Sequence, residues 1–328
     1  MYRQKGLSLV ELMVAIALGL VLMGGVIQLF LSSRIVFSTQ QALSRVQENG
    51  RFAIEFITRD LRQAGYTGCT SRNLPVMSDL AGAAGLSFWN AYTLPSDAML
   101  AVQGFEDAIT GVTLAPAPLS GDILVVRYAD GVPSVLAADN TVAGQLSLRG
   151  SLANGCLNGL CQNTTAIVSN CVGARIFRVA SLATDGANVR LNHGGPWPGA
   201  FVSTSGNFVA GGEVLPMFTV AYYVANNPSG QPSLYRAVNG VNGIEMVEGV
   251  ERMVLRFRHE NGDYLESSEV TNWALINGVR VELLLQANEN NMLDEAQTYT
   301  LGGEETDSFA DRRYRQVFGT TVAVRSRI

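Results

Sequence analysis

The sequence predicts an α+β protein in which one long amino-terminal helix precedes a large antiparallel β-sheet globular domain. An apolar run over residues 7–31 contains a single charge, Glu11, and a helical stripe of apolar residues continues to Ala64. After Gly65, segments rich in β-branched residues alternate with turn clusters, and no regular helical pattern separates them. Strands without intervening helices favour antiparallel sheet over a doubly wound α/β fold.

The apolar run is long enough to cross a lipid bilayer. At about 1.5 Å per residue, residues 7–31 reach roughly 37 Å, against a bilayer core of about 30 Å. Arg3 and Lys5 precede the run and mark that end as cytoplasmic, which places the remaining chain on the periplasmic side. Glu11 costs roughly 2.5–3.5 kcal/mol inside a membrane segment, so it is a candidate functional residue.

The second half of the helix is expected to be amphipathic over residues 32–65, and Gly65 gives a stop signal. The stripe expected to pack on a domain consists of Ile35, Val36, Leu43, Val46, Phe52, Ala53, Phe56, Ile57, Leu61 and Ala64. The charges assigned to the opposite face are Arg45, Glu48, Arg51, Glu55, Arg59, Asp60 and Arg62. One helix is therefore predicted over residues 7–64.

The globular domain is predicted over residues 66–328. Residues 66–120 are rich in Gly, Ala, Pro and Ser and are expected to form a loop-rich insert. The predicted strands lie at 122–128, 145–148, 175–179, 189–191, 217–224, 233–238, 254–257, 279–286 and 317–324. With 328 residues, 47% of them apolar, the chain can bury a substantial core.

Two readings of the amino terminus compete with a processed filament subunit. A cleaved secretory signal has a shorter apolar core with a small-residue site after it, whereas Lys5-Gly6 lies before this run. A plain membrane anchor fits the length but gives Glu11 no role. The third reading rests on residues 5–11, which read KGLSLVE. They resemble the class III leader of type IV pilins and type II secretion pseudopilins.

This resemblance implies that residues 1–6 are a leader peptide, which a prepilin peptidase removes between Gly6 and Leu7. It implies that the new amino terminus, Leu7, is then N-methylated. It also implies that Glu11 meets the amino-terminal charge of a neighbouring subunit, and a buried carboxylate does need a cationic partner. The commonest pattern starts the mature chain with Phe, so Leu7 is a mild departure.

Segments of the globular half resemble the PilW family of minor pilins, and the likeness is weakest over residues 72–118. They lie at 121–128, 170–177, 233–236, 247–253 and 312–318. Glu248 and Glu251, in the fourth segment, are expected to be solvated or ion-paired. The resemblance implies a structural subunit that primes pilus assembly with other minor pilins and ends at or near the tip, with twitching motility, adhesion and DNA uptake as downstream roles.

The implied partners are other minor pilins, the major pilin, the prepilin peptidase/N-methyltransferase, the inner-membrane assembly platform and inner-membrane lipid. The implied location is the inner membrane, as a single-pass protein with a periplasmic domain, and then the pilus. A J-type pseudopilin of a type II secretion system shares the leader, helix and sheet domain and stays an alternative. A membrane-anchored periplasmic binding protein or adhesin is the alternative of a different class.

Four cysteines lie beyond the membrane segment: Cys69, Cys156, Cys161 and Cys171. An even count in a periplasmic domain indicates disulfides, although four cysteines allow three pairings. The Asn-Gly-rich segment around Cys156 and Cys161 indicates a stapled turn, so we favour 156–161 with 69–171, which would tie the helix exit to the first lobe. A zinc site is the alternative, and the spacing, the compartment and the lack of a nearby His argue against it.

Composition argues against nucleic acid as a direct partner and against an enzyme. The formal net charge is −5, and cleavage after Gly6 would remove Arg3 and the only lysine, Lys5. A P-loop needs a lysine, and no Gly-x-Ser-x-Gly elbow is present. His193 and His259 lack metal-ligand spacing. We therefore expect no catalytic, cofactor-binding or metal-binding residues. The polar segment 288–295 offers oxygen ligands without EF-hand spacing and is predicted to be a hairpin loop.

Overall fold

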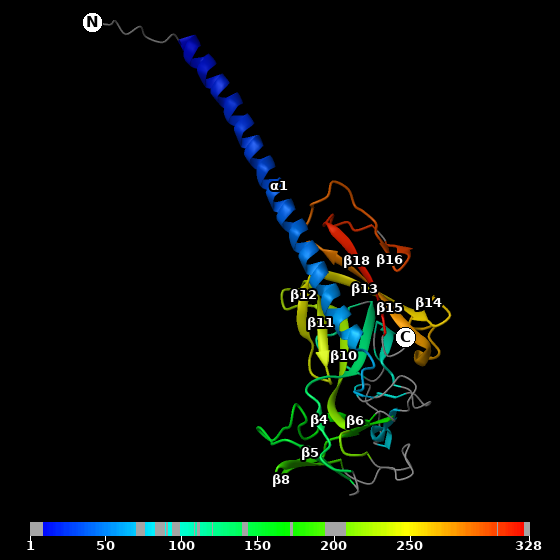
Figure 1. The fold of residues 1–328 in the computed structure, drawn as a ribbon. Coiled ribbons are helices and arrows are strands. Elements are labelled where there is room, and N and C mark those ends of the chain that lie inside the picture. Colours follow the sequence, from blue (N-terminus) through cyan, green and yellow to red (C-terminus); the bar gives the residue numbers. More distant parts are fainter. Residues whose placement is uncertain are drawn as a thin grey trace, which may run out of the picture.

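The computed structural model describes residues 9–69, 76–82, 89, 91–93, 99–107, 109, 112–119, 121–139, 144–170, 173–193, 208–306 and 308–324. One helix, α1 (Leu9–Gln63), runs for 55 residues, and its amino-terminal half stands clear of the rest of the chain (Figure 1). Sheets make up the body of the described chain after α1, so the predicted α+β class is confirmed.

The helix ends at the glycine that the sequence indicates. Gly65 has φ of +74°, a left-handed conformation that costs glycine little and other residues more. Its backbone N–H donates to the carbonyl oxygen of Arg127 at 2.8 Å, so the end of the helix is joined at once to a strand. The predicted helix end at Ala64 therefore agrees with the structure to within one residue, and Leu7, its predicted start, lies outside the described residues.

The described strands are β1 (Val76–Ser78), β2 (Val102–Glu106), β3 (Asp122–Ala129), β4 (Ser134–Val135), β5 (Gln145–Arg149), β6 (Thr165–Asn170), β7 (Gly173–Arg178), β8 (Ser181–Asp185), β9 (Asn188–Asn192), β10 (Glu213–Asn226), β11 (Pro232–Val238), β12 (Ile244–Glu248), β13 (Val250–His259), β14 (Tyr264–Leu265), β15 (Ile276–Gln286), β16 (Thr300–Leu301), β17 (Glu304–Glu305) and β18 (Arg315–Ala323). Among the described residues, η1 (Asp79–Gly82) and η3 (Trp273–Leu275) are short 3-10 turns.

The long strand β10 organises the largest sheet of the described chain. Its first part pairs with β6 and β4, and its second part pairs with β3 and β11. The sheet continues through β7 and β1 on one side and ends at β12 on the other. Pro216 is the last residue paired with β6, and Met217 is the first paired with β3. The partners of β10 therefore change at a residue without a backbone N–H.

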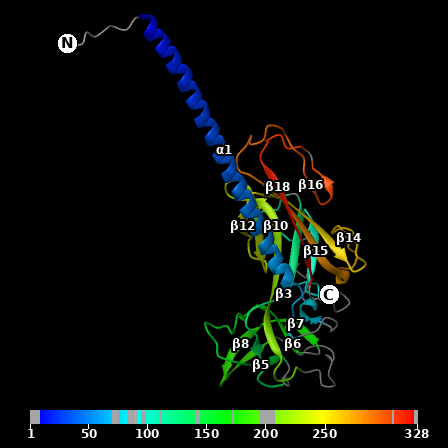
Figure 2. The same ribbon diagram turned by 45° about the horizontal axis from the view of Figure 1, so that its top comes forward.

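A second sheet, in the order β14-β13-β15-β18, forms the other wall of the main core. The carboxyl-terminal half of α1 lies across β10–β12 and the β13–β15–β18 sheet in both views (Figures 1 and 2). Buried side chains of α1, of β3 and β10, and of β13 and β15 form one continuous cluster. The helix therefore closes the core of the half of the molecule nearer the membrane segment.

The far end of the molecule has a core of its own. A three-stranded sheet in the order β5-β9-β8 packs there with β4, β6 and β7 (Figure 2). Its buried residues, such as Leu148, Phe177 and Leu191, form a cluster separate from the one that α1 closes. We call the part from β4 to β9, residues 134–192, the distal lobe.

The nine predicted strands all have counterparts, but the sequence reading missed several others. β1 and β2 lie inside the segment predicted to be loop-rich, and β6, β8 and β12 were not predicted. β1 pairs with β7 in parallel, which is an exception to the antiparallel rule for the rest of the described sheets. Parallel pairing joins segments far apart in sequence, so no local pattern announces it.

The apolar stripe of α1 was partly wrong. Val46, Ala53, Ile57 and Leu61 are buried as expected. Ile35, Val36 and Phe52, however, are 66%, 52% and 51% exposed. Ile35 and Val36 lie before the first residue of α1 that is buried on the sheets, Ala42, and Phe52 lies about 100° around the helix from Ala53.

Candidate functional site

The amino-terminal part of α1 is an apolar surface with one carboxylate. Every Leu, Ile, Val, Met and Phe from position 9 to position 37 is more than half exposed. An 18-residue window of this helix has a mean hydropathy of 2.5, and none of it is buried against the described chain. Length and composition therefore make this segment fit to cross a bilayer, or to pack against other apolar helices.

Glu11 lies in the first described turn of α1 and is exposed. In lipid this carboxylate would favour a cation beside it, because an isolated charge there is costly. Gly6 and Leu7, the predicted cleavage site, lie outside the described residues, so their processing stays a prediction.

A buried polar cluster joins the other end of α1 to the sheet. Asp60 accepts hydrogen bonds from three side chains: Tyr222 Oη donates to Oδ2 at 2.7 Å, Arg236 Nε donates to Oδ2 at 2.9 Å, and Tyr128 Oη donates to Oδ1 at 3.2 Å. These donors come from β10, β11 and β3. The side chain of Asp60 is only 8% exposed. One helical carboxylate thus connects α1 to three adjacent strands.

The electrostatics of this cluster favour a charged Arg236 beside neutral tyrosines. Burial opposes the charge of Arg236, but the attraction of Asp60 outweighs it and raises the pKa of the guanidinium. Burial, followed by the charge of Asp60, raises the pKa of Tyr128 and of Tyr222, so both hydroxyls stay protonated donors at neutral pH. Removal of Asp60 or of Arg236 would therefore be costly, because it would leave the other group without its charged partner.

The sequence reading placed Asp60 on the solvent face, and this assignment was wrong. Asp60 is buried, in line with Ala53, Ile57 and Ala64 along the helix. The spacing of three or four residues from each buried neighbour was the available signal. Asp60 was assigned to the solvent face because it is charged, and acidic residues are rarely buried unless a partner is present. The sequence did not show its partners.

The helix approaches the second sheet closely at Gly50. A Cβ atom built on Gly50 would lie 2.5 Å from the ring of Phe318 in β18. One residue earlier, Asn49 Nδ2 donates to the carbonyl oxygen of Glu248, the last residue of β12, at 3.0 Å. Glycine at this place leaves room for the ring of Phe318 to lie directly against the backbone of α1.

Arg315 closes the carboxyl-terminal segment onto the start of β13. Its guanidinium donates to Glu251 Oε2 at 2.6 Å and to Asp311 Oδ1 at 2.7 Å, and it lies 3.8 Å from the ring centre of Phe309. Burial opposes its charge, but the hydrogen bonds that it donates to Asp311 and Glu251 raise its pKa. Glu251 was expected to be solvated or ion-paired, and it is ion-paired.

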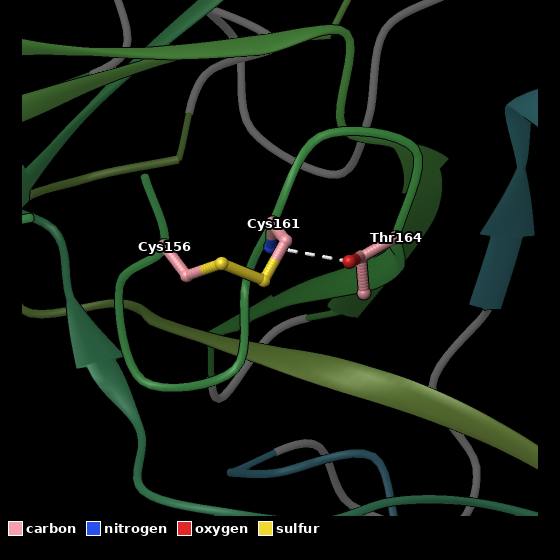
Figure 3. Close-up of a disulfide and its surroundings, with 3 residues drawn as sticks. All are labelled: Cys156, Cys161 and Thr164. Atoms are coloured by element: carbon pink, nitrogen blue, oxygen red, sulfur yellow. Dashed lines mark hydrogen bonds between the residues drawn. A yellow bond between two sulfur atoms is a disulfide. The ribbon is translucent and has the colours of Figure 1, made fainter. Parts of the chain in front are cut away.

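The expected disulfide between Cys156 and Cys161 is present in the distal lobe, with an Sγ–Sγ distance of 2.06 Å (Figure 3). Asn154-Gly155 and Asn158-Gly159 each form a tight turn with positive φ at both residues, which brings the two cysteines together. The N–H of Cys161 donates to Thr164 Oγ1 at 3.1 Å. The second predicted pair, Cys69 with Cys171, stays a prediction. Cys69 is disulfide-bonded, but Cys171 lies outside the described residues.

A cavity of about 330 Å³ lies between the start of β3, β13 and the β16–β17 hairpin. Its lining includes Glu106, Asp122, Arg256, Glu266 and Glu304. Burial raises the pKa of Asp122 to about 6. Within the described part of the chain, no three His, Cys, Asp or Glu side chains are grouped so that they could hold a metal ion.

Two family models match the chain. Residues 221–326 match the family described as type IV pilus-assembly protein W, PilW, and residues 1–27 match the prokaryotic N-terminal methylation motif. The first match covers the end of β10 and the strands up to β18, which include β12, β15 and β18, packed on α1. The second covers the predicted cleavage site and Glu11. No curated protein and no solved structure gives a significant match.

Proposed function

We propose that this chain, a PilW-like minor pilin of the type IV pilus with an N-terminal methylation motif, joins other minor pilins in a complex that primes pilus assembly. The complex would end at or near the pilus tip. The role is structural: the chain contributes an apolar helix and a sheet domain to an assembly. The observation that supports it most is the exposed membrane-length half of α1 with Glu11 in its first turn.

The proposed course begins in the inner membrane. Arg3 and Lys5 would hold the amino terminus on the cytoplasmic side, and disulfides such as Cys156–Cys161 fit a periplasmic domain. Cleavage after Gly6 would give Leu7 a free amine, which is then methylated. In the filament, Glu11 of one subunit would pair with that amine on a neighbour, and this contact would fix the axial register of the two helices.

The processing step is tested by mass spectrometry of the protein recovered from cells. We expect the mature chain to begin at N-methyl-Leu7 and to lack residues 1–6. Gly6→Val should leave full-length precursor in the membrane, because the peptidase needs a small residue before the cut. Protein that still begins at Met1 in the unmodified chain would overturn the proposed course.

The assembly step is tested with Glu11→Ala. We expect normal cleavage and normal membrane level but loss of the protein from sheared pili, because the partner amine loses its anion. Glu55→Ala, an exposed carboxylate on the same helix outside the membrane segment, is the matched control and should assemble. Function that survives Glu11→Ala would favour a membrane-anchored binding protein or adhesin instead.

Partner capture separates the pilus from a type II secretion system. A tagged chain, cross-linked in cells, should recover other minor pilins and the major pilin. Recovery of secretion pseudopilins without pilus subunits would assign the chain to the J-type pseudopilins.

A further inference from the structure

We infer that Asp60, with Tyr128, Tyr222 and Arg236, is a latch that fixes the axial position of α1 on the sheet domain and must open before the helix can slide. The inference concerns the fold of this chain and does not depend on the pilus assignment. It follows from the contrast between two kinds of contact along the docked half of α1.

The apolar contacts of this half hold the helix on the sheets without fixing its position along its own axis strongly. Two of its buried positions, Ala42 and Ala53, carry small side chains, whereas at Gly50 the ring of Phe318 fits closely against the helix. Apolar burial is non-directional and depends chiefly on the area removed from water.

The polar cluster, in contrast, depends strongly on the position of α1 along its axis. Its three donors reach Asp60 at 2.7, 2.9 and 3.2 Å, and hydrogen bonds weaken steeply outside a narrow range of distance and angle. A shift of α1 by one helical turn, about 5.4 Å, would break all three at once. It would also leave the half-buried guanidinium of Arg236, 27% exposed, without its anion.

The place of the latch suits a pull on the membrane half of α1. Asp60 lies four residues before Ala64, at the end of the helix far from the membrane segment. Its donors belong to β3, β10 and β11, which are hydrogen-bonded neighbours in the largest sheet. A force along α1 would therefore be transmitted through the carboxylate of Asp60 to three strands of the sheet.

The first test is hydrogen exchange on the full chain in detergent micelles. In Asp60→Asn we expect the amides of residues 52–63 to exchange about 100-fold faster, because removal of one partner of a buried pair is costly. Exchange in β15 should not change. Glu55→Gln, an exposed carboxylate five residues earlier on the helix, is the control and should behave as wild type.

The second test measures position. Spin labels at Glu48→Cys on α1 and Thr320→Cys on β18 report the distance between helix and sheet. We expect a single narrow distance in the wild-type background and, with Asp60→Asn, a second population displaced by about one turn. Tyr222→Phe removes one donor and keeps the ion pair, so it should give a smaller second population and serves if Asp60→Asn does not fold.

Three results would overturn the inference. These are no rise in exchange in residues 52–63, an equal rise in α1 and β15, or faster exchange with the spin-label distance unchanged in both variants. The last two would make Asp60 a contributor to general stability with no part in fixing the position of the helix.

Discussion

Asp122 is the first residue of β3, and its carboxylate links the two large sheets. Its Oδ2 accepts a hydrogen bond from the N–H of Leu255 in β13 at 2.6 Å. Burial is the largest cause that raises its pKa, Glu106 and Glu266 add to it, and the Leu255 hydrogen bond and Arg256 oppose it, with a net pKa of about 6. The native state therefore holds a proton between about pH 4 and pH 6 that the unfolded chain has already lost.

This raised pKa predicts a pH dependence of stability with a definite sign. Because the folded state binds the proton more tightly, the contribution of Asp122 falls as pH rises through the folded pKa. Between pH 5 and pH 7.5 the free energy of unfolding should drop by about 1 kcal/mol through this group.

Denaturant unfolding of wild type and Asp122→Asn at the two pH values measures this contribution. The variant should be less destabilised by the higher pH than the wild type. Equal pH slopes for the two proteins would contradict the assignment.

Some side-chain roles could be predicted from the sequence, and others could not. The leader-like segment, Glu11 and the Cys156–Cys161 pair could be picked out because each depends on neighbours in sequence. Asp60 could not be assigned its partners, because Tyr128, Tyr222 and Arg236 lie on strands far along the chain. The linking role of Asp122 likewise needs the fold that brings β13 beside it.

Helix α1 shows the same division at the scale of an element. Its existence, its end at Gly65 and most of its buried positions follow from local composition and periodicity. Its contact with β18 through Gly50 does not, because a glycine inside a helix reads as a weak helix former until its neighbour is known. β8 was not predicted because its sequence, SLATD, has no clear apolar alternation, and its last three residues are exposed.

The close approach at Gly50 predicts the effect of adding one methyl group. Gly50→Ala should lower the free energy of unfolding by about 1–3 kcal/mol, since the new Cβ would displace the ring of Phe318. Gly24→Ala is the matched control: the same gain in helix propensity applies, and nothing lies within 4 Å of its Cβ.

The double variant Gly50→Ala/Phe318→Leu tests the cause. It should recover part of the loss, which denaturant unfolding in micelles measures as a coupling energy. A Gly50→Ala protein as stable as the Gly24→Ala protein would contradict the close contact.

On the scale of the whole molecule, the described chain has a half closed by α1 and a distal lobe with its own core. The PilW match begins at residue 221, so it includes strands against α1 and leaves the distal lobe outside. Strand β10 runs through both parts, and the disulfide between Cys156 and Cys161 lies wholly in the lobe.

Separate cores predict that damage to one part stays local. Cys156→Ser/Cys161→Ser should lower the free energy of unfolding of the lobe by about 2 kcal/mol. The unfolded chain without this short disulfide loop has more conformational entropy to lose on folding. Hydrogen exchange should rise in residues 151–164 and stay unchanged in α1 and β15. Faster exchange in α1 as well would show that the two cores unfold as one unit.

The pairing of Ala129 with Met217 has a practical consequence. Between these two residues the chain forms the distal lobe, so it leaves and re-enters the part of the sheet that packs on α1 on adjacent strands, at Cα positions about 5 Å apart. A foreign domain whose two ends lie close together could therefore replace the distal lobe between these positions. The half closed by α1 would then present that domain in place of the lobe, as a display scaffold.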